Sequence, residues 1–252
     1  MRFLGINLCD KVPDAKTIWK FKNDLAETKT VNTLFCMFDE YLEKEGLISH
    51  KGTIVDATFV DAPRQRNSRD ENKKIKNGEI PEEWEKPENK SKLAQKDTDA
   101  DWTKKNGERH FGYKDHVKCD ADSKLITNYS VTSASVHDSQ RCLVFIGQED
   151  EVLYADSAYS GKPIALALPE NCKNQICEKG YRNSPLTSEQ KMNNRRKSRI
   201  RCRIEHIFGF MTGAMHGITI RSIGITRAWM NIGITNLVYN FCRYSYLKRA
   251  SA

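Results

Sequence analysis

Short runs of aliphatic, β-branched and aromatic residues constrain the fold of this chain more than any other feature. Residues 53–60 (TIVDATFV) have the pattern of a buried strand that ends before Pro63. A β-hairpin is expected from two further runs and the polar turn between them, at 110–117, 125–131 and 120–123. Helices and strands then alternate, with helices expected at 140–146 and 162–168 and strands at 152–156 and 175–177. This order of elements predicts an α/β fold with a mixed sheet flanked by helices.

Apolar residues recur at helical spacing at both ends of the chain. Residues 14–45 predict two short helices, so residues 1–50 form an N-terminal helical segment before a domain over 51–247. A helix is also predicted from Ser188 to about Met211, and a largely apolar helix follows it, with Thr226 as the candidate N-cap.

Residues 64–107 differ in composition from the rest of the chain. They contain 12 Lys or Arg and 10 Asp or Glu among 44 residues, so half of the segment is charged. A segment this polar buries too little apolar surface to order itself. It is therefore interpreted as a long, mobile, solvated loop inserted after the first strand, with Trp84 and Trp102 as anchor points. A dedicated DNA clamp is the alternative.

The overall charge favours a polyanionic partner. The formal net charge is +8 and the isoelectric point is about 9.0, which suits nucleic acid or an anionic membrane surface. No apolar run is long enough to span a bilayer and the N-terminus lacks the core of a signal peptide, so a cytoplasmic protein is expected. Eight scattered cysteines without a CxxC pair indicate free, buried thiols rather than a metal site or disulfides.

Three carboxylates stand out by their positions. Asp56 lies inside the apolar run 53–60, and Asp156 ends the run 152–156. An ionised acid in such surroundings needs compensation by positive charge, and strand ends of an α/β sheet are common ligand sites. Glu205, on the edge of a helical apolar stripe, can reach the same place. Three such acids can hold a pair of Mg²⁺ ions, and their hard oxygen ligands argue against Zn²⁺ or Cu²⁺. The alternative is that the two Asp residues cap turns or form buried ion pairs.

Basic residues precede Glu205 on its predicted helix. Seven positive charges occur with no acid between them, which predicts contacts with DNA phosphates, at Lys191, Arg195, Arg196, Lys197, Arg199, Arg201 and Arg203. Arg201, one turn before Glu205, is placed to bind a phosphate next to the scissile one. A solvated basic face is the alternative for Arg195, Arg196 and Lys197.

Other polar residues have two interpretations each. Lys114 and His116 share one face of their strand and could approach DNA, although a structural role is equally consistent with the pattern. Asp138 is expected to cap the helix that follows it. His206 could orient Glu205, and Gly112 and Gly209 are expected to allow close packing.

The motifs together resemble a known family. IVDATFVDAPRQRN, KDTDADWTKKNGERHFGYKDHV, TSASVHDSQ, YADSAYSG and RCRIEHIFG occur in the order and with the spacing of bacterial DDE transposases of the insertion sequence 5 family. The resemblance covers nearly the whole chain and implies an RNase H-like catalytic fold in which Asp56, Asp156 and Glu205 are the DDE triad. Related proteins have Tyr and Lys where this chain has Ser198 and Thr212, so those phosphate contacts are not transferred.

The resemblance also implies a function. It implies Mg²⁺-dependent cleavage at the ends of an insertion sequence and strand transfer into target DNA, with Mn²⁺ able to substitute. DNA ends, target DNA and a second copy of the chain are the implied partners, in the cytoplasm at the nucleoid. Many relatives carry a further N-terminal segment, so here residues 1–50 and the basic surface are expected to recognise the ends, unless the reading frame starts late. A catalytically inactive DNA-binding remnant and a host-directed nuclease are the alternatives.

Overall fold

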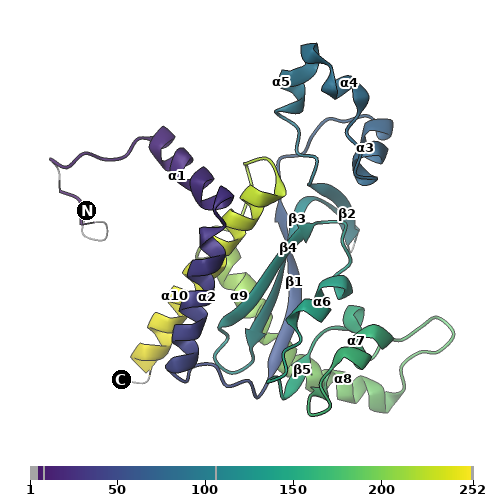
Figure 1. Ribbon diagram of the computed structural model, residues 1–252. Coiled ribbons are helices and arrows are strands. Elements are labelled where there is room, and N and C mark those ends of the chain that lie inside the picture. Colours follow the sequence, from purple (N-terminus) through teal and green to yellow (C-terminus); the bar gives the residue numbers. More distant parts are fainter. Residues whose placement is uncertain (1–4, 8, 106, 251–252) are drawn as a thin grey trace.

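The computed structural model describes residues 5–7, 9–105 and 107–250, and Figure 1 shows their arrangement. A mixed sheet lies at the centre, with helices on both of its faces and a small group of helices beyond one end. No helix of the described part of the chain is long and apolar enough to cross a membrane.

The sheet is built around a long central strand. β3 (Glu108–Asp120) pairs antiparallel with β1 (Thr53–Asp61), β4 (Ile126–Ser133) and β2 (Asp101–Lys105). On the other side of β1, β5 (Val152–Tyr154) and β6 (Lys173–Asn174) continue the sheet in parallel. The predicted strands at 53–60 and 152–156 and the predicted hairpin, now β3–β4, are confirmed. The strand predicted at 175–177 is wrong in its bounds, because the strand in this part of the chain is Lys173–Asn174. Six strands in this order are consistent with an RNase H-like fold.

Gly112 permits the close approach of β3 to β1. Its φ is +146°, and a Cβ there would stand 2.3 Å from the carbonyl oxygen of Val60. Only glycine fits this position without displacing backbone, so the expected close packing is confirmed. At Gly209 the same expectation is wrong, because an added Cβ would meet no atom within 4 Å.

The two faces of the sheet bury different cores. Ile54 belongs to a cluster with residues of β3, β4 and the C-terminal helices, whereas its neighbour Val55 packs with Leu153, Phe145 and Ile164. Successive strand residues point to opposite faces. Helices α6 (Ser139–Phe145) and α7 (Lys162–Ala167) therefore cover one face, and Asp56, two residues after Ile54, belongs to the other.

Helices from both ends of the chain cover that second face. The predicted N-terminal pair is confirmed as α1 (Ala15–Glu27) and α2 (Thr30–Lys44), and α2 lies beside the long α10 (Ile225–Ala250) in Figure 1. The expected Thr226 cap is wrong: α10 begins at Ile225, whose N–H donates to the Asp99 carboxylate at 2.8 Å.

The predicted long helix from Ser188 is divided in two. α8 (Ser188–Arg201) and α9 (Arg203–Thr212) meet at Cys202. The backbone stays helical there, but the Glu205 N–H donates to Cys202 O at 3.1 Å, three residues back instead of four. This tighter turn separates α8, which carries Arg201, from α9, which carries Glu205.

The charged segment 64–107 is not an irregular loop, so this expectation is corrected. It contains β2 and a compact helical group that projects from one end of the sheet in Figure 1: α3 (Arg69–Lys76), α4 (Glu82–Glu85), η1 (Pro87–Asn89) and α5 (Lys90–Leu93). Trp84 is fully buried within it, its indole N–H donates to Glu71 at 2.7 Å, and Lys92 and Lys96 lie over its ring. One aromatic core, with charged side chains packed round it, provides the order that composition did not predict.

All eight cysteines are free, as predicted. Four of the thiols are buried, at Cys119, Cys142, Cys172 and Cys177, and the others are exposed or half-buried.

Candidate active site

Asp56 is a largely buried acid in the middle of β1. Its side chain is 14% exposed, one carboxylate oxygen accepts the Ala57 N–H at 2.8 Å, and the other accepts from Arg201 at 2.9 Å. The pKa of Asp56 is raised to about 6, mainly by burial and also by the nearby charge of Asp156, against the lowering effect of the Ala57 N–H, Arg201 and Lys105. A carboxylate held in this state is typical of functional sites.

Asp156 follows the neighbouring strand. β1 and β5 pair in parallel with Ile54 opposite Tyr154, so Asp56 and Asp156 each come two residues after this pair, Asp156 beyond the end of β5. Asp156 is the N-cap of η2 (Ser157–Tyr159), where its carboxylate accepts the Ala158 N–H at 2.7 Å. The capping role considered from the sequence is therefore confirmed for Asp156. The cap occupies one carboxylate oxygen, and the acid still lies close enough to raise the pKa of Asp56.

Glu205 approaches from the first turn of α9. Its side chain is 58% exposed and accepts from Arg201 at 3.1 Å, across one helical turn. The buried residues Ile204, Ile207 and Met211 fix α9 against the sheet, so the exposed Glu205 is carried on a rigid element.

Arg201 joins two of the three acids. One guanidinium nitrogen donates to Asp56 and another to Glu205, so a single planar cation bridges β1 and α9. The predicted role of Arg201 as a phosphate ligand stays a prediction, since its donors are directed at carboxylates here. The fork geometry of arginine, which suits bidentate anions, explains how one side chain serves both.

The donor chemistry of the site fits a hard divalent cation. Asp56, Asp156 and Glu205 offer carboxylate oxygens, and the mutual repulsion of the two Asp residues is of the kind that a cation relieves. In the conformation described for residues 5–7, 9–105 and 107–250, no three His, Cys, Asp or Glu side chains are gathered as a metal site. Arg201 provides the positive charge between Asp56 and Glu205 instead.

Tyr159 and Lys105 were not identified from the sequence. The Tyr159 hydroxyl is buried without a hydrogen-bond partner among the described residues, and burial raises its pKa, with Asp56 and Asp156 adding to the rise. Lys105 lowers the pKa of Asp56 from the end of β2. Tyr159 follows Asp156 in the motif YADSAYSG, which was the available signal, whereas nothing in the charged segment distinguished Lys105.

Lys114 and His116 are not available to DNA in this structure, which corrects their assignment as DNA-binding residues. Lys114 is buried, donates to Asp138 and to Val136 O at 2.7 Å each, and lies over Phe59. His116 is buried against Thr132 at 2.8 Å, and burial lowers its pKa to about 4. Asp138 precedes α6, but the predicted cap is wrong, because its carboxylate pairs with Lys114 and makes no cap hydrogen bond.

The basic residues of α8 and α9 separate into two groups. Arg203 donates to Ala121 O at 2.7 Å and Asp122 at 3.0 Å, and Lys197 donates to Ile176 O at 2.9 Å, so both tie their helix to neighbouring segments. Arg195, Arg196 and Arg199 are exposed, and a groove along α8 is lined by Arg195 and Arg199 together with Lys191. The exposed group has the surface access that the predicted contacts with DNA need.

His206 does not orient Glu205. Its Nδ1 lies 2.9 Å from Lys124 Nζ, on the turn between β3 and β4.

Comparison with known proteins gives one family. The family model for the transposase DDE domain matches residues 48–241, more than half of the chain, and this range includes all three acids. α1 and α2 precede it. No solved structure matches the chain.

Proposed function

The chain belongs to the family of DDE transposases, and from this premise we propose that it cleaves DNA at the ends of an insertion sequence and joins the freed ends to target DNA. The observation that carries the proposal is that Asp56 and Glu205, 149 residues apart by 205 − 56, both bind one guanidinium, while Asp156 follows the adjacent strand β5. We assign it to the insertion sequence 5 group on the motifs of its sequence.

The proposed reaction is phosphodiester displacement. In cleavage, a water oxygen attacks phosphorus, its proton leaves to solvent or a base, and the bond to the 3′ oxygen breaks, which frees a 3′-OH. In strand transfer, that 3′-OH attacks a target phosphate and a target 3′ oxygen leaves. Asp56, Asp156 and Glu205 would hold Mg²⁺ or Mn²⁺, which when bound lowers the pKa of water and stabilises the leaving oxygen.

Protein side chains supply the other contacts with DNA. Arg201, with two donors beside the acids, is placed to exchange a carboxylate for a phosphate oxygen when DNA binds. Arg195, Arg196 and Arg199 face solvent along α8 and contribute non-specific attraction to the DNA backbone. A homodimer that holds two ends together, in the cytoplasm at the nucleoid, completes the proposal.

The experiment compares two Asp-to-Asn variants on one strand. Purified protein is incubated with labelled DNA carrying the ends of its own locus and Mg²⁺, and nicked and joined products are separated on a denaturing gel. We expect Asp56→Asn to abolish both products and retain DNA binding. Asp61→Asn, on the exposed end of β1, is the control and should retain activity. Equal cleavage by the Asp56 variant and the native protein would refute the assignment.

The two alternatives give different products in the same assay. A DNA-binding remnant leaves the DNA uncut with Mg²⁺, although it retards the same DNA on a native gel. A host-directed nuclease cuts DNA that lacks the terminal sequences equally well. Inverted repeats flanking the gene, with short target duplications, belong only to a mobile element.

A further inference from the structure

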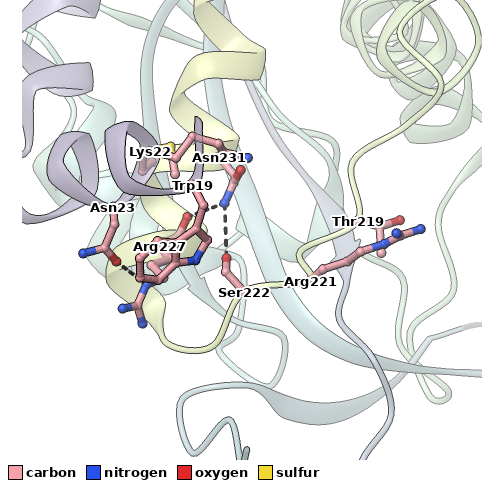
Figure 2. A pocket seen from close by; sticks show the side chains of 9 residues that line it. Trp19, Lys22, Asn23, Thr219, Arg221, Ser222, Arg227 and Asn231 are labelled. Atoms are coloured by element: carbon pink, nitrogen blue, oxygen red, sulfur yellow. Dashed lines mark hydrogen bonds between the residues drawn. The ribbon is translucent and has the colours of Figure 1, made fainter. Parts of the chain in front are cut away.

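A second polar site lies away from the three acids, where α1 meets the start of α10. A pocket of about 360 Å³ opens there, beside the extended segment that leads into α10 (Figure 2). Its volume is at the lower end of the range of ligand pockets, enough for a nucleotide unit rather than a large molecule. Its lining comes from three parts of the chain: Trp19, Lys22 and Asn23; Thr219, Arg221 and Ser222; Arg227, Met230 and Asn231.

The lining is positively charged without compensation. It includes three cations, Lys22, Arg221 and Arg227, and no carboxylate. None of the three makes an ion pair with another described residue. The carboxylate of Asp99, which lies beside the first residue of α10, accepts the Ile225 N–H and pairs with none of these three cations. The Arg221 side chain extends away from Trp19 and Arg227 in Figure 2, so this cation lies at the edge of the hollow, and the three uncompensated cations together attract a polyanion.

Neutral hydrogen-bond partners hold the guanidinium of Arg227 in place. Arg227 donates through Nε to Asn23 Oδ1 at 2.8 Å and through a terminal nitrogen to Ile223 O at 3.0 Å. Asn231 in turn donates to Ser222 at 3.3 Å and to the Arg227 carbonyl at 2.8 Å, and Figure 2 shows this connected set. The guanidinium is thus oriented by groups that leave its charge intact, which is how a preorganised anion site is built.

An aromatic side chain completes the lining. Trp19 is 62% exposed, although a large apolar ring gains by being covered. Phosphate-binding cations beside an exposed aromatic ring are the combination that binds nucleic-acid strands, since the ring packs on a base or sugar while the cations bind the backbone.

We propose that this pocket binds the phosphodiester backbone of DNA, with Lys22, Arg221 and Arg227 at phosphate oxygens and Trp19 against the adjoining base or sugar. The inference rests on the proposed action on DNA. It also gives the N-terminal helices a role in binding, because α1 lies outside the matched family domain and Arg221 and Arg227 lie inside it, so DNA in this pocket contacts both. Phosphate contacts of this kind fix where a duplex lies on the protein.

The charge test uses two double variants of equal charge. Lys22→Ala with Arg221→Ala removes two pocket cations, whereas Lys16→Ala with Lys20→Ala removes two exposed cations of α1 that do not line the pocket. Binding of a fluorescein-labelled 30-base-pair duplex is measured by anisotropy as salt is raised. We expect the pocket variant to lower the slope of log K against log salt by about two and to weaken binding roughly tenfold. The control should change neither quantity as much.

The aromatic test uses two rings of equal exposure on one helix. Trp19 and Phe21 are both 62% exposed and lie about 200° apart round α1. We expect Trp19→Ala to weaken binding of a single-stranded 30-mer at least fivefold and Phe21→Ala to leave it unchanged. Circular dichroism and urea unfolding check that each variant folds, which is expected because the changed side chains are exposed.

The outcomes separate this inference from the proposed function. If pocket and control variants bind DNA equally while the native protein cleaves its ends, the pocket assignment is overturned and the catalytic one stands. If pocket variants lose binding while no cleavage occurs, the pocket is supported and the catalytic proposal fails. A change in sedimentation with unchanged DNA binding would assign the pocket to an acidic segment of a second copy and overturn the inference.

Discussion

The charge of Asp56 makes the folded protein less stable, and its removal is predicted to stabilise the fold. Burial raises the pKa of this carboxyl from 3.8 to about 6. Between these values the folded state binds more protons than the unfolded state, so stability falls as pH rises, and the full penalty is present above pH 6. A shift of about two units corresponds to roughly 3 kcal/mol. The penalty disappears below pH 3.8, where both states are protonated.

Asp56→Asn keeps the shape of the side chain and removes the charge. We expect it to be more stable than the native protein by about 1–3 kcal/mol at pH 8. The gain is smaller than the full penalty to the extent that Arg201 loses one of its two ion-pair partners. At pH 5 the advantage should fall to about half, because part of the native carboxyl is then protonated. A variant that loses activity and gains stability is typical of a functional site.

The assay is urea unfolding followed by tryptophan fluorescence at pH 5, 6.5 and 8. Asp61→Asn on the same strand is the control, since that side chain is 67% exposed and its substitution should leave stability unchanged. The reasoning is wrong if the Asp56 variant is less stable than the native protein at pH 8, or if the difference between them does not depend on pH.

Three other predictions concern packing. Gly112→Ala should destabilise the fold by about 2–5 kcal/mol in urea unfolding, because its Cβ would stand 2.3 Å from a backbone oxygen. Gly209→Ala should stabilise it by up to about 1 kcal/mol, because alanine favours the helix and meets no neighbour there. Equal effects of the two substitutions would contradict this difference in packing. Trp84→Ala should cost about 3–5 kcal/mol and open the charged segment to limited proteolysis; an unchanged digestion pattern would contradict the role of its buried ring. Lys114→Ala should destabilise by about 3–5 kcal/mol, since it leaves Asp138 unpaired, but should not change the salt slope of DNA binding; a smaller slope would restore Lys114 as a DNA ligand.

The strand β1 was predictable because its signal is local. A run of β-branched and aromatic residues favours a strand whatever surrounds it, and an acid within that run, Asp56, is conspicuous in any context. The same holds for the hairpin β3–β4, where Asp120 accepts the backbone N–H groups of Asp122 and Ser123 and closes the polar turn. Such features need only neighbours in sequence.

The partners of charged side chains were not predictable, because these partners are distant in sequence. Lys114 and Arg199 are both basic residues and the sequence does not distinguish their roles. Lys114 is buried in an ion pair with Asp138, whereas Arg199 faces solvent. Trp84 orders a segment whose composition indicates disorder, since its ring packs with Lys92 and Lys96.

The sequence by itself determined the strands β1, β3, β4 and β5, most of the helices outside the charged segment, and the family, and it singled out the three acids, because those depend on local pattern and on motif spacing. Tertiary structure alone decided that Arg201 bridges Asp56 and Glu205, and that Lys22 of α1 meets Arg221 and Arg227 in one pocket. The physical reason is that a charge takes its role from whichever opposite charge, water or void the folded chain places beside it, and that placement is set by the packing of the whole core.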